Sequence, residues 1–404
     1  MVHHSEVFIL EIIIGSIKGK MTLFIIEVKA HNPGHYTREL NQFAKYISND
    51  FDSIFILTPF GFRDRWEEIK NCEIKMLCSK NNDLNKHPFD ILSKLYNYQW
   101  EFYKNTVKYL SSFQNNTYII HIWDFISVFP VWYFFRKVKV NKILNLKAIY
   151  REQNSLLGIK ILGNIQGLLS KKLILNIADK YIVHTTEIFN EAVSIGIKKN
   201  KIFKIGIGAE NLSVNLNRDK ARSKLNISNN FFVILFFGTI RKEKGIYELF
   251  EHIKDIKSSF VLLIVGENKL DESISSLIKK YDVKANIILE IKYIPEKELE
   301  LYFRASDAVV ICHRKEFKGE SGVLLKALQY QVPIIANLGN NSARIVENEQ
   351  IGSTFDILLH EDILKAISYI KQNIKQIELN LVASQKKYSW ENVIPYFKSI
   401  YFSN

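Results

Sequence analysis

Short apolar runs rich in β-branched and aromatic residues alternate along this chain with longer segments of helical period. The runs 231–237 and 260–265, for example, flank a segment in which apolar residues recur every three or four positions. Such alternation is typical of parallel β-sheets whose strands are joined by crossover helices, so an α/β fold is predicted. The 404 residues exceed one typical hydrophobic core, and we therefore expect two domains.

The pattern also predicts where each element lies. In the first half, strands are expected at 23–28, 53–57, 73–77, 117–121, 144–150 and 180–184, and helices at 34–48, 89–112, 156–177 and 187–195. In the second half, strands are expected at 231–237, 260–265, 286–290, 308–312 and 332–336, and helices at 245–256, 271–281, 296–305, 322–330 and 342–347. The stretch 206–230 begins with glycines and continues with polar residues, and its apolar residues follow no clear period. It is expected to link a domain at 1–205 to a domain at 231–388.

The chain is basic, with 55 Lys and Arg against 42 Asp and Glu and a formal net charge of +13. This charge favours polyanionic partners, namely nucleotides, nucleic acid or an anionic membrane surface. Basic residues are spread along the chain and are not gathered with aromatics in one stripe, so nucleic acid is the least favoured of the three. With 47% hydrophobic and 24% charged residues, the composition is that of a folded protein.

Only Cys72, Cys78 and Cys312 occur, without a CxxC spacing or a nearby histidine at ligand intervals. Neither a disulfide framework nor a metal site is therefore predicted, and no cofactor is expected. A reducing cytoplasm fits this use of cysteine.

Two apolar runs bear on membranes. The run 7–17 is interrupted by Glu11 and lacks a basic leader, so it is not expected to be a signal peptide, and Met21 is an alternative start just before the first strand. The run 126–135 is too short to span a bilayer. It is expected to be a buried helix or strand, the alternative being a patch that dips into a membrane surface.

The loop after the strand 231–237 concentrates glycines and cations. Gly238 can adopt a conformation closed to other residues, Arg241 can bind an oxyanion with two parallel hydrogen bonds, and Lys244 adds a point charge. A helix starting near Lys244 would direct its positive dipole end to the same place. The pattern indicates a site for a nucleotide diphosphate. The alternative is an ordinary turn in a lysine-rich chain.

A second cluster follows the strand 308–312. Gly319, Ser321 and Gly322 open a helix directly after a charged loop, so free backbone N–H groups are expected at the carboxyl edge of the same sheet. Open α/β sheets bind ligands along that edge. Together the two loops predict a clamp for a diphosphate.

The chain resembles the GT-B glycosyltransferases, in particular the retaining family four. The matching motifs are Phe-Gly-x-Ile-Arg-x-x-Lys-Gly at 237–245, Ser-Gly-Val-Leu-x-x-Ala-Leu at 321–328, Val-Pro-Ile-Ile-Ala at 332–336 and Tyr-Ser-Trp at 388–390. The resemblance implies two Rossmann-like domains facing each other across a cleft. The second would bind the donor nucleotide and the first the acceptor, and a final helix within 389–404, which Ser389 could cap, would cross back to the first domain.

The resemblance also implies site residues. The catalytic candidates are Arg241, Lys244 and Glu152. The donor-binding candidates are Gly238, Thr239, Gly266, Tyr293, Ile294, Glu320, Ser321, Gly322, Val323 and Lys326. The candidates for acceptor and sugar binding are Gly34, His35 and Asp124. For the first-domain residues the alternatives are a plain strand-to-helix turn at Gly34 and His35, and a satisfied polar pair of His121 and Asp124.

The sequence departs from the family at two positions. Many members carry two glutamates eight positions apart, which contact the sugar and the ribose, and these positions are Lys318 and Lys326 here. A cation cannot accept the ribose hydroxyl protons. Glu316 or Glu320 could take over the sugar contact if the loop is placed differently.

The resemblance implies a hexosyltransferase, retaining and independent of metal, that moves a sugar from a nucleotide diphosphate sugar to a hydroxyl acceptor. The acceptor would be a glycan or lipid-linked, in assembly of a cell-surface polysaccharide or glycolipid, at the cytoplasmic face of the membrane. The alternative is a catalytically silent subunit with the same fold that binds nucleotides or glycans. A nucleotide-sugar epimerase is disfavoured because no carboxylate and histidine set stands at the crevice.

Overall fold

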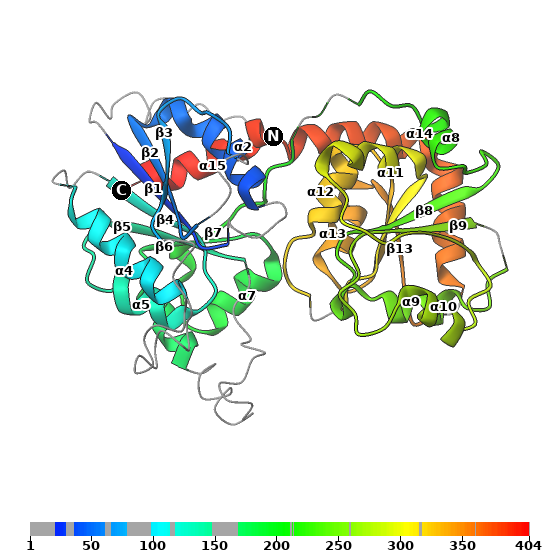
Figure 1. The fold of residues 1–404 in the computed structure, drawn as a ribbon, viewed down its shortest axis with the longest axis horizontal. Helices are drawn as coiled ribbons and strands as arrows, with labels where there is room; N and C mark the ends of the chain where they lie inside the picture. The colour runs from blue at the N-terminus through cyan, green and yellow to red at the C-terminus, as the bar shows by residue number, and fades with distance from the viewer. Residues whose placement is uncertain are drawn as a thin grey trace. The chain divides into compact units, whose positions relative to one another are not determined.

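The computed structural model describes residues 21–29, 36–60, 66–78, 98–113, 118–147, 169–210, 212, 214–257, 260–314, 317–359 and 361–403 (Figure 1). The chain forms two compact units. One consists of residues 1–208 together with 393–404, and the other of residues 209–392. Each unit is built on its own parallel sheet.

The first unit contains a sheet of seven described strands in the order β3-β2-β1-β4-β5-β6-β7. The strands are β1 (Thr22–Glu27), β2 (Ser53–Thr58), β3 (Cys72–Met76), β4 (Tyr118–Asp124), β5 (Asn141–Leu146), β6 (Lys180–Val183) and β7 (Ile202–Lys204). The helices are α2 (Tyr36–Ile47), η1 (Ser48–Asp50), α4 (Tyr98–Ser111), α5 (Val128–Phe135), α7 (Thr186–Ser194) and η4 (Lys199–Lys201). Phe24, Phe102, Val131 and Ile188 belong to one core under α4, α5 and α7.

The last helix, α15 (Trp390–Phe402), packs against the first unit. The ring of Phe397 lies 5.1 Å from that of Phe43, and the ring of Phe402 lies 5.4 Å from that of Phe51. Tyr401 also shares a hydrogen bond with the buried His121 of β4. The return of the chain's final residues to the first domain is therefore confirmed.

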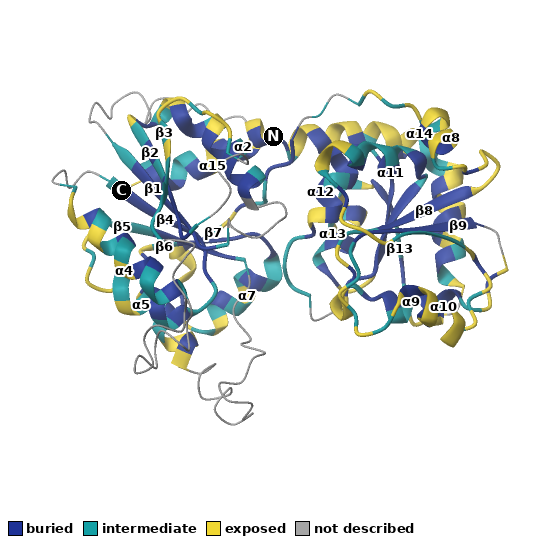
Figure 2. Ribbon diagram, in the orientation of Figure 1, coloured by how far each residue is buried: buried dark blue, intermediate teal, exposed yellow. Residues whose placement is uncertain are grey.

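The second unit contains a sheet of six described strands in the order β10-β9-β8-β11-β12-β13. The strands are β8 (Phe232–Phe237), β9 (Phe260–Val265), β10 (Asn286–Glu290), β11 (Ala308–Ile311), β12 (Ile334–Asn337) and β13 (Gly352–Phe355). The helices are α8 (Arg218–Lys224), η5 (Lys242–Lys244), α9 (Ile246–Ile253), α10 (Ile274–Lys280), η6 (Glu296–Glu298), α11 (Leu299–Ala305), α12 (Gly322–Gln329), α13 (Asn341–Glu349) and α14 (Asp362–Lys387). Figure 2 shows the inner strands of both sheets buried and the outer helix faces exposed, and the edge strands β3 and β10 are mostly half-buried.

The strand order of the second unit determines where a ligand is expected. The chain runs outward from β8 through β9 and β10, and then returns to the other side of β8 to form β11, β12 and β13. The order therefore reverses between β8 and β11. Parallel α/β sheets bind ligands at the carboxyl ends of the strands beside such a reversal.

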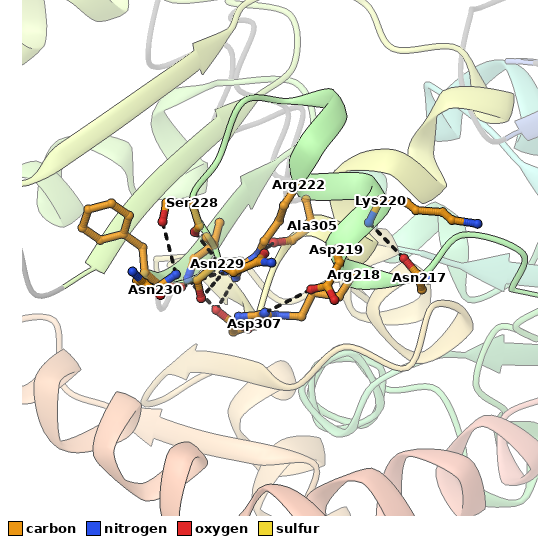
Figure 3. A network of polar contacts seen from close by, with 12 residues as sticks. Asn217, Arg218, Asp219, Lys220, Arg222, Ser228, Asn229, Asn230, Ala305 and Asp307 are labelled. Atoms are coloured by element: carbon orange, nitrogen blue, oxygen red, sulfur yellow. Dashed lines mark hydrogen bonds and ion pairs between the residues drawn. The ribbon is translucent and has the colours of Figure 1, made fainter.

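Helix α8 lies inside the segment 206–230 that was expected to be a linker. Its Arg222 is fully buried and donates hydrogen bonds to the carbonyls of Ala305 and Phe231, both at 2.9 Å, and to Asp307 at 2.6 Å (Figure 3). Asp307 in turn accepts the backbone N–H of Val233, at the start of β8. Because these bonds fix α8 to the sheet, residues 209–230 cluster with the second unit.

Other local expectations change in detail. The run 126–135 contains a helix, α5. The short strands β7 and β13 and the long helix α14 were not predicted. Ser389 precedes α15, but its buried hydroxyl has no hydrogen-bond partner among the described residues, so the predicted side-chain cap is wrong. The start of α15 is tied instead to Ala209, whose carbonyl accepts the N–H of Trp390 at 3.2 Å.

Candidate functional site

Two glycines let the loops after β8 and β9 touch. Gly238 follows β8 with φ of 102°, and its N–H donates to the carbonyl of Val265 at 3.0 Å. Gly266 follows β9 with φ of 141°, and a Cβ there would lie 2.1 Å from the carbonyl oxygen of Gly238. Only glycine fits such a close backbone approach.

A third glycine ties the same loop to β11. Gly245 has φ of 76°, and a Cβ there would lie 2.0 Å from the carbonyl oxygen of Cys312. It ends the 3₁₀ turn η5 and precedes α9, so the α-helix begins at Ile246 and not at Lys244 as expected. The N–H of Arg314 also donates to the carbonyl of Glu243 at 3.3 Å. The loops after β8 and β11 thus form one packed edge.

The start of α12 lies at this edge. Ser321 is its N-cap, and the Ser321 hydroxyl accepts the N–H of Leu324 at 3.4 Å. Gly322 is exposed, and a Cβ there would meet no atom within 4 Å. Val323 lies beside the β8 loop, with Cγ2 3.8 Å from a Cβ built at Gly238. The structure therefore brings the two predicted clusters together, with N–H groups of a helix start open to a ligand.

Lys244 and His313 form a close pair at the same edge. Lys244 Nζ lies 3.1 Å from His313 Nε2, and the His313 ring contacts the Phe317 ring with centroids 4.1 Å apart. Burial lowers the pKa of His313 to about 2, and the charges of Lys244 and Arg241 act in the same direction. The imidazole is thus neutral, and Nε2 accepts a hydrogen bond from the ammonium.

The pKa of Lys244 is lowered as well, to about 8, mainly by burial and then by Arg241. Its side chain is half-buried, and a cavity of about 10 Å³, the room of one water molecule, lies beside it and Val323. Arg241 differs, because its side chain is half-exposed and pairs with Glu243 at 3.1 Å. Lys244 is thus held against buried residues, whereas the Arg241 side chain is half-exposed to solvent.

The remaining donor candidates lie around this edge. Thr239 is exposed in the β8 loop and Glu320 is half-buried before α12. After β10, the Tyr293 side chain is 60% exposed whereas Ile294 is buried. Lys326 on α12 is paired with Glu296 of η6.

In the first unit, Asp124 ends β4 and is buried. It accepts the ammonium of Lys29 at 2.9 Å and the N–H of Phe125 at 2.7 Å. Glu27, its neighbour at the end of β1, is fully buried, and burial together with the Asp124 charge raises the pKa of Glu27 to about 8. The pairing of His121 with Asp124 that had been an alternative is not formed, because His121 bonds Tyr401 and Asn145.

Comparison with known proteins identifies the second unit. Residues 217–388 match the family described as glycosyl transferases group 1. The glycosyl transferase segment carries every predicted donor residue, and the resemblance noted in the sequence is confirmed.

Relatives and solved structures extend this likeness. The chain is 30% identical over 167 residues to the capsular polysaccharide biosynthesis glycosyltransferase CapM of Staphylococcus aureus, covering 38% of this chain and 42% of CapM. It is 22% identical over 287 residues to the alpha-monoglucosyldiacylglycerol synthase of Acholeplasma laidlawii, covering 66% and 68% of the two chains. It resembles the structure of Anabaena HepE in complex with UDP and glucose, with a TM-score of 0.67 and 13% identity over 94% of this chain and 98% of HepE. The GT-B fold is thereby confirmed.

Three candidates of this glycosyltransferase-like chain, Gly34, His35 and Glu152, lie outside the described residues. Among the residues that the structure does describe, no group of three or more His, Cys, Asp or Glu side chains is placed to hold a metal ion. Within the same residues, no helix has the length and apolar character needed to cross a membrane.

Sequence reasoning missed His313 as a partner of Lys244. The two residues are 69 positions apart, so no local spacing connects them. The available signal was a histidine directly after a buried strand of the glycosyl transferase segment, at the edge where ligands bind.

Proposed function

We propose that this protein is a glycosyltransferase that transfers a sugar from a nucleotide diphosphate sugar to a hydroxyl acceptor. The observation that carries the proposal is the meeting of Gly238, Lys244 and the start of α12 at one sheet edge. Exposed backbone N–H groups and cations at one edge suit a diphosphate.

The chemistry assigned to these groups is electrostatic. Breaking the bond between sugar and nucleotide leaves a new negative charge on the β-phosphate. Lys244 and Arg241 stabilise that charge more in the transition state than in the ground state, because they are in place beforehand. If the stereochemistry is retained, the leaving phosphate accepts the proton of the acceptor hydroxyl, and no metal is required.

His313 is proposed as a positioning residue for Lys244. Its neutral Nε2 accepts one N–H of the ammonium and leaves the other two for phosphate oxygens. The backbone of His313 is itself held, because its carbonyl accepts from Asn337 and Asn340 at 3.3 and 3.2 Å.

The donor and acceptor are proposed from the relatives. HepE was solved with UDP and glucose, so UDP-glucose is the first donor to test, with Tyr293 and Ile294 at the base and Glu320 near the sugar. The names of CapM and of the Acholeplasma synthase favour a polysaccharide or glycolipid acceptor at the cytoplasmic face of the membrane. Asp124 is proposed to bind it in the first unit, along with Gly34, His35 and Glu152.

A silent nucleotide-binding subunit is the second candidate. One observation favours it: Lys326, at the position of the family's ribose-binding glutamate, is engaged with Glu296. In the transferase, Glu296 would have to supply the carboxylate that Lys326 lacks.

The deciding experiment measures release of UDP and transfer of labelled glucose by the purified chain. Lys244→Ala and Arg241→Ala should each lower turnover about a hundredfold or more, as loss of one transition-state donor typically does. Lys242→Ala is the matched control, because Lys242 lies in the same turn with an exposed side chain. Near-full activity of the Lys244 or Arg241 variant would contradict the mechanism, and UDP binding without any turnover would favour the silent subunit.

A further inference from the structure

A pocket of about 520 Å³ opens on the first unit, away from the proposed acceptor residue Asp124. It is lined by Val107, Leu110, Ser111, Tyr118, Tyr133, Phe134, Arg136, Lys137, Val138, Lys139 and Val140. Tyr118 is the first residue of β4 and Val140 directly precedes β5, so the pocket lies at the amino ends of these parallel strands. Asp124 ends β4, at the opposite edge of the sheet. The pocket is therefore separate from Asp124, the described residue of the proposed acceptor site.

The pocket is positively charged. Arg136, Lys137 and Lys139 line it with exposed side chains, and none of the described residues in its lining is an aspartate or glutamate. Among the described residues, no carboxylate forms an ion pair with any of the three. Elsewhere surface lysines are commonly neutralised, as Lys254 is by Glu251 at 2.6 Å. Three cations around one concave surface, none ion-paired within the described part of the chain, attract a phosphate or another anion.

Helices α4 and α5 lie against each other (Figure 1). Aromatic side chains of both helices continue from the pocket, since the Trp100 ring contacts the rings of Tyr133 and Phe134. The Arg136 guanidinium stacks 4.4 Å from the centre of the Trp132 ring and 4.7 Å from that of Tyr133. Tyr133 is 40% exposed, and its ring lies 5.0 Å from that of Trp100. Trp and Tyr rings beside Arg and Lys are the combination found at the headgroup level of membranes.

We propose that this surface, formed by the pocket and by Trp100, Trp132 and Tyr133, docks on an anionic membrane with a lipid headgroup phosphate in the pocket. A volume of about 520 Å³ is that of a small-molecule site and accommodates a glycerophosphate headgroup. The aromatic rim, in which Tyr133 is exposed and Trp100 and Trp132 are half-buried, distinguishes a lipid from a free phosphate, because only a lipid also offers an apolar phase to the rings. The transfer reaction does not require this surface, so the inference goes beyond the proposed activity.

Co-sedimentation of the full chain with vesicles tests the proposal. Vesicles of equal parts phosphatidylglycerol and phosphatidylcholine should pellet the protein, whereas pure phosphatidylcholine should not. At about 1 kcal/mol for each cation near a charged surface, the triple variant Arg136→Gln, Lys137→Gln, Lys139→Gln should bind roughly a hundredfold more weakly. Salt at about 1 M, where the Debye length falls to about 3 Å, should release the wild type.

The matched control is Lys224→Gln, Lys279→Gln, Lys375→Gln, which removes three exposed charges from the second unit and should bind vesicles within about threefold of the wild type, since these charges lie outside the proposed surface. Tyr133→Ser tests the rim separately and should weaken vesicle binding while leaving the charge unchanged. UDP titration of all variants should match the wild type, which separates this proposal from the proposed transferase activity.

Equal vesicle binding by the wild type and the Arg136 triple variant would overturn the proposal. So would equal binding to neutral and anionic vesicles. If millimolar inorganic phosphate alone displaced the protein from vesicles at constant ionic strength, the pocket would be a free-phosphate site and the membrane proposal would fail.

Discussion

Lys244 differs from the other cations of its loop because its half-buried side chain places the ammonium against the neutral, buried imidazole of His313. With the pKa of the free protein lowered to about 8, the ammonium begins to lose its proton just above physiological pH. A diphosphate favours the charged form, so its binding raises the pKa of Lys244. Between the two pKa values, binding therefore takes up a proton.

The affinity for UDP should consequently weaken above pH 8, by up to about tenfold per pH unit. Titration calorimetry between neutral and alkaline pH, in two buffers of different ionisation enthalpy, measures both the affinity and the proton uptake. Lys244→Arg is the control, because a guanidinium stays charged throughout this range and its pH dependence should be flat. If the affinity for UDP fell equally with pH in the wild type and in Lys244→Arg, Lys244 would be excluded as the titrating group.

Two glycines at the same edge have opposite structural roles. Gly266→Ala would place a methyl group 2.1 Å from a backbone oxygen at a φ of 141°, and should destabilise the protein by several kcal/mol in a urea titration. Gly322→Ala adds its methyl group where no atom lies within 4 Å, so stability should change by less than about 1 kcal/mol.

The Gly322→Ala variant should nevertheless bind UDP about tenfold more weakly, because its methyl group stands where a phosphate is proposed to approach. Fluorescence titration with UDP measures this effect. Unchanged affinity in a stable Gly322→Ala protein would rule out the start of α12 as the anion site.

For single residues, the sequence predicted the glycines and cations of the loops better than it predicted which side chains these residues contact. Glycines at 238, 245 and 322 and the cations at 241 and 244 could be found from local pattern, because turn geometry and charge are local properties. The contact of Lys244 with His313 could not, since it depends on two loops that meet only in the folded sheet. The Lys326 pair with Glu296 is of the same kind.

Helix α8 shows how a single buried charge can fix an element. Arg222 is fully buried and satisfies three backbone carbonyls at the turn before β8 as well as Ala305 and Asp307. Removing one partner of a buried pair leaves the other uncompensated. Arg222→Ala should therefore cost about 3–5 kcal/mol of unfolding free energy, measured by urea titration.

Arg218→Gln is the matched control for α8. Arg218 also binds Asp307, at 2.8 Å, but its side chain is 39% exposed. An exposed ion pair contributes about 0–1 kcal/mol, so this variant should stay within about 1 kcal/mol of the wild type. Similar losses of unfolding free energy in the two variants would show that burial of the arginine does not determine how strongly its contacts stabilise α8.

Strands β9 and β10 were predicted to the residue from their apolar runs, whereas the strand expected at 144–150 is β5, at Asn141–Leu146. Strand β13, with the sequence Gly-Ser-Thr-Phe, was missed because its side chains carry no apolar alternation. Its pairing with β12 defines it instead. Helix α8 was missed for a related reason, since two of the groups that hold Arg222, the Ala305 carbonyl and the Asp307 carboxylate, lie 83 and 85 positions further along the chain.

The whole chain is expected to unfold in two steps, because each unit has its own core. In scanning calorimetry, UDP at about a hundred times its dissociation constant should stabilise only the second unit, by about 2.7 kcal/mol. Arg222→Ala should lower the midpoint temperature of the second unit's unfolding transition. Tyr401→Phe removes the hydroxyl that pairs with the buried His121. It should lower the unfolding free energy of the first unit by about 1–3 kcal/mol.

A shift of both transitions by UDP, or a loss in the second unit's transition on changing Tyr401, would show that the two units do not unfold independently. A phenylalanine ring at position 401 can keep the ring contacts that Tyr401 makes with Phe43 and Phe51, so the Tyr401→Phe variant isolates the hydrogen bond from the packing.

The place of α15 has a consequence for synthesis on the ribosome. Residues 1–208 leave the ribosome first, but Phe43, Phe51 and His121 meet their partners only when residues 393–404 have followed. At about 5–20 residues per second, translating the intervening second unit takes on the order of 10–40 s. The first unit must wait through that time with part of its apolar surface uncovered, whereas the second unit, continuous in sequence, can fold as it emerges. The half of the chain made first is therefore the half completed last, and during that interval it is the part that chaperones would need to protect.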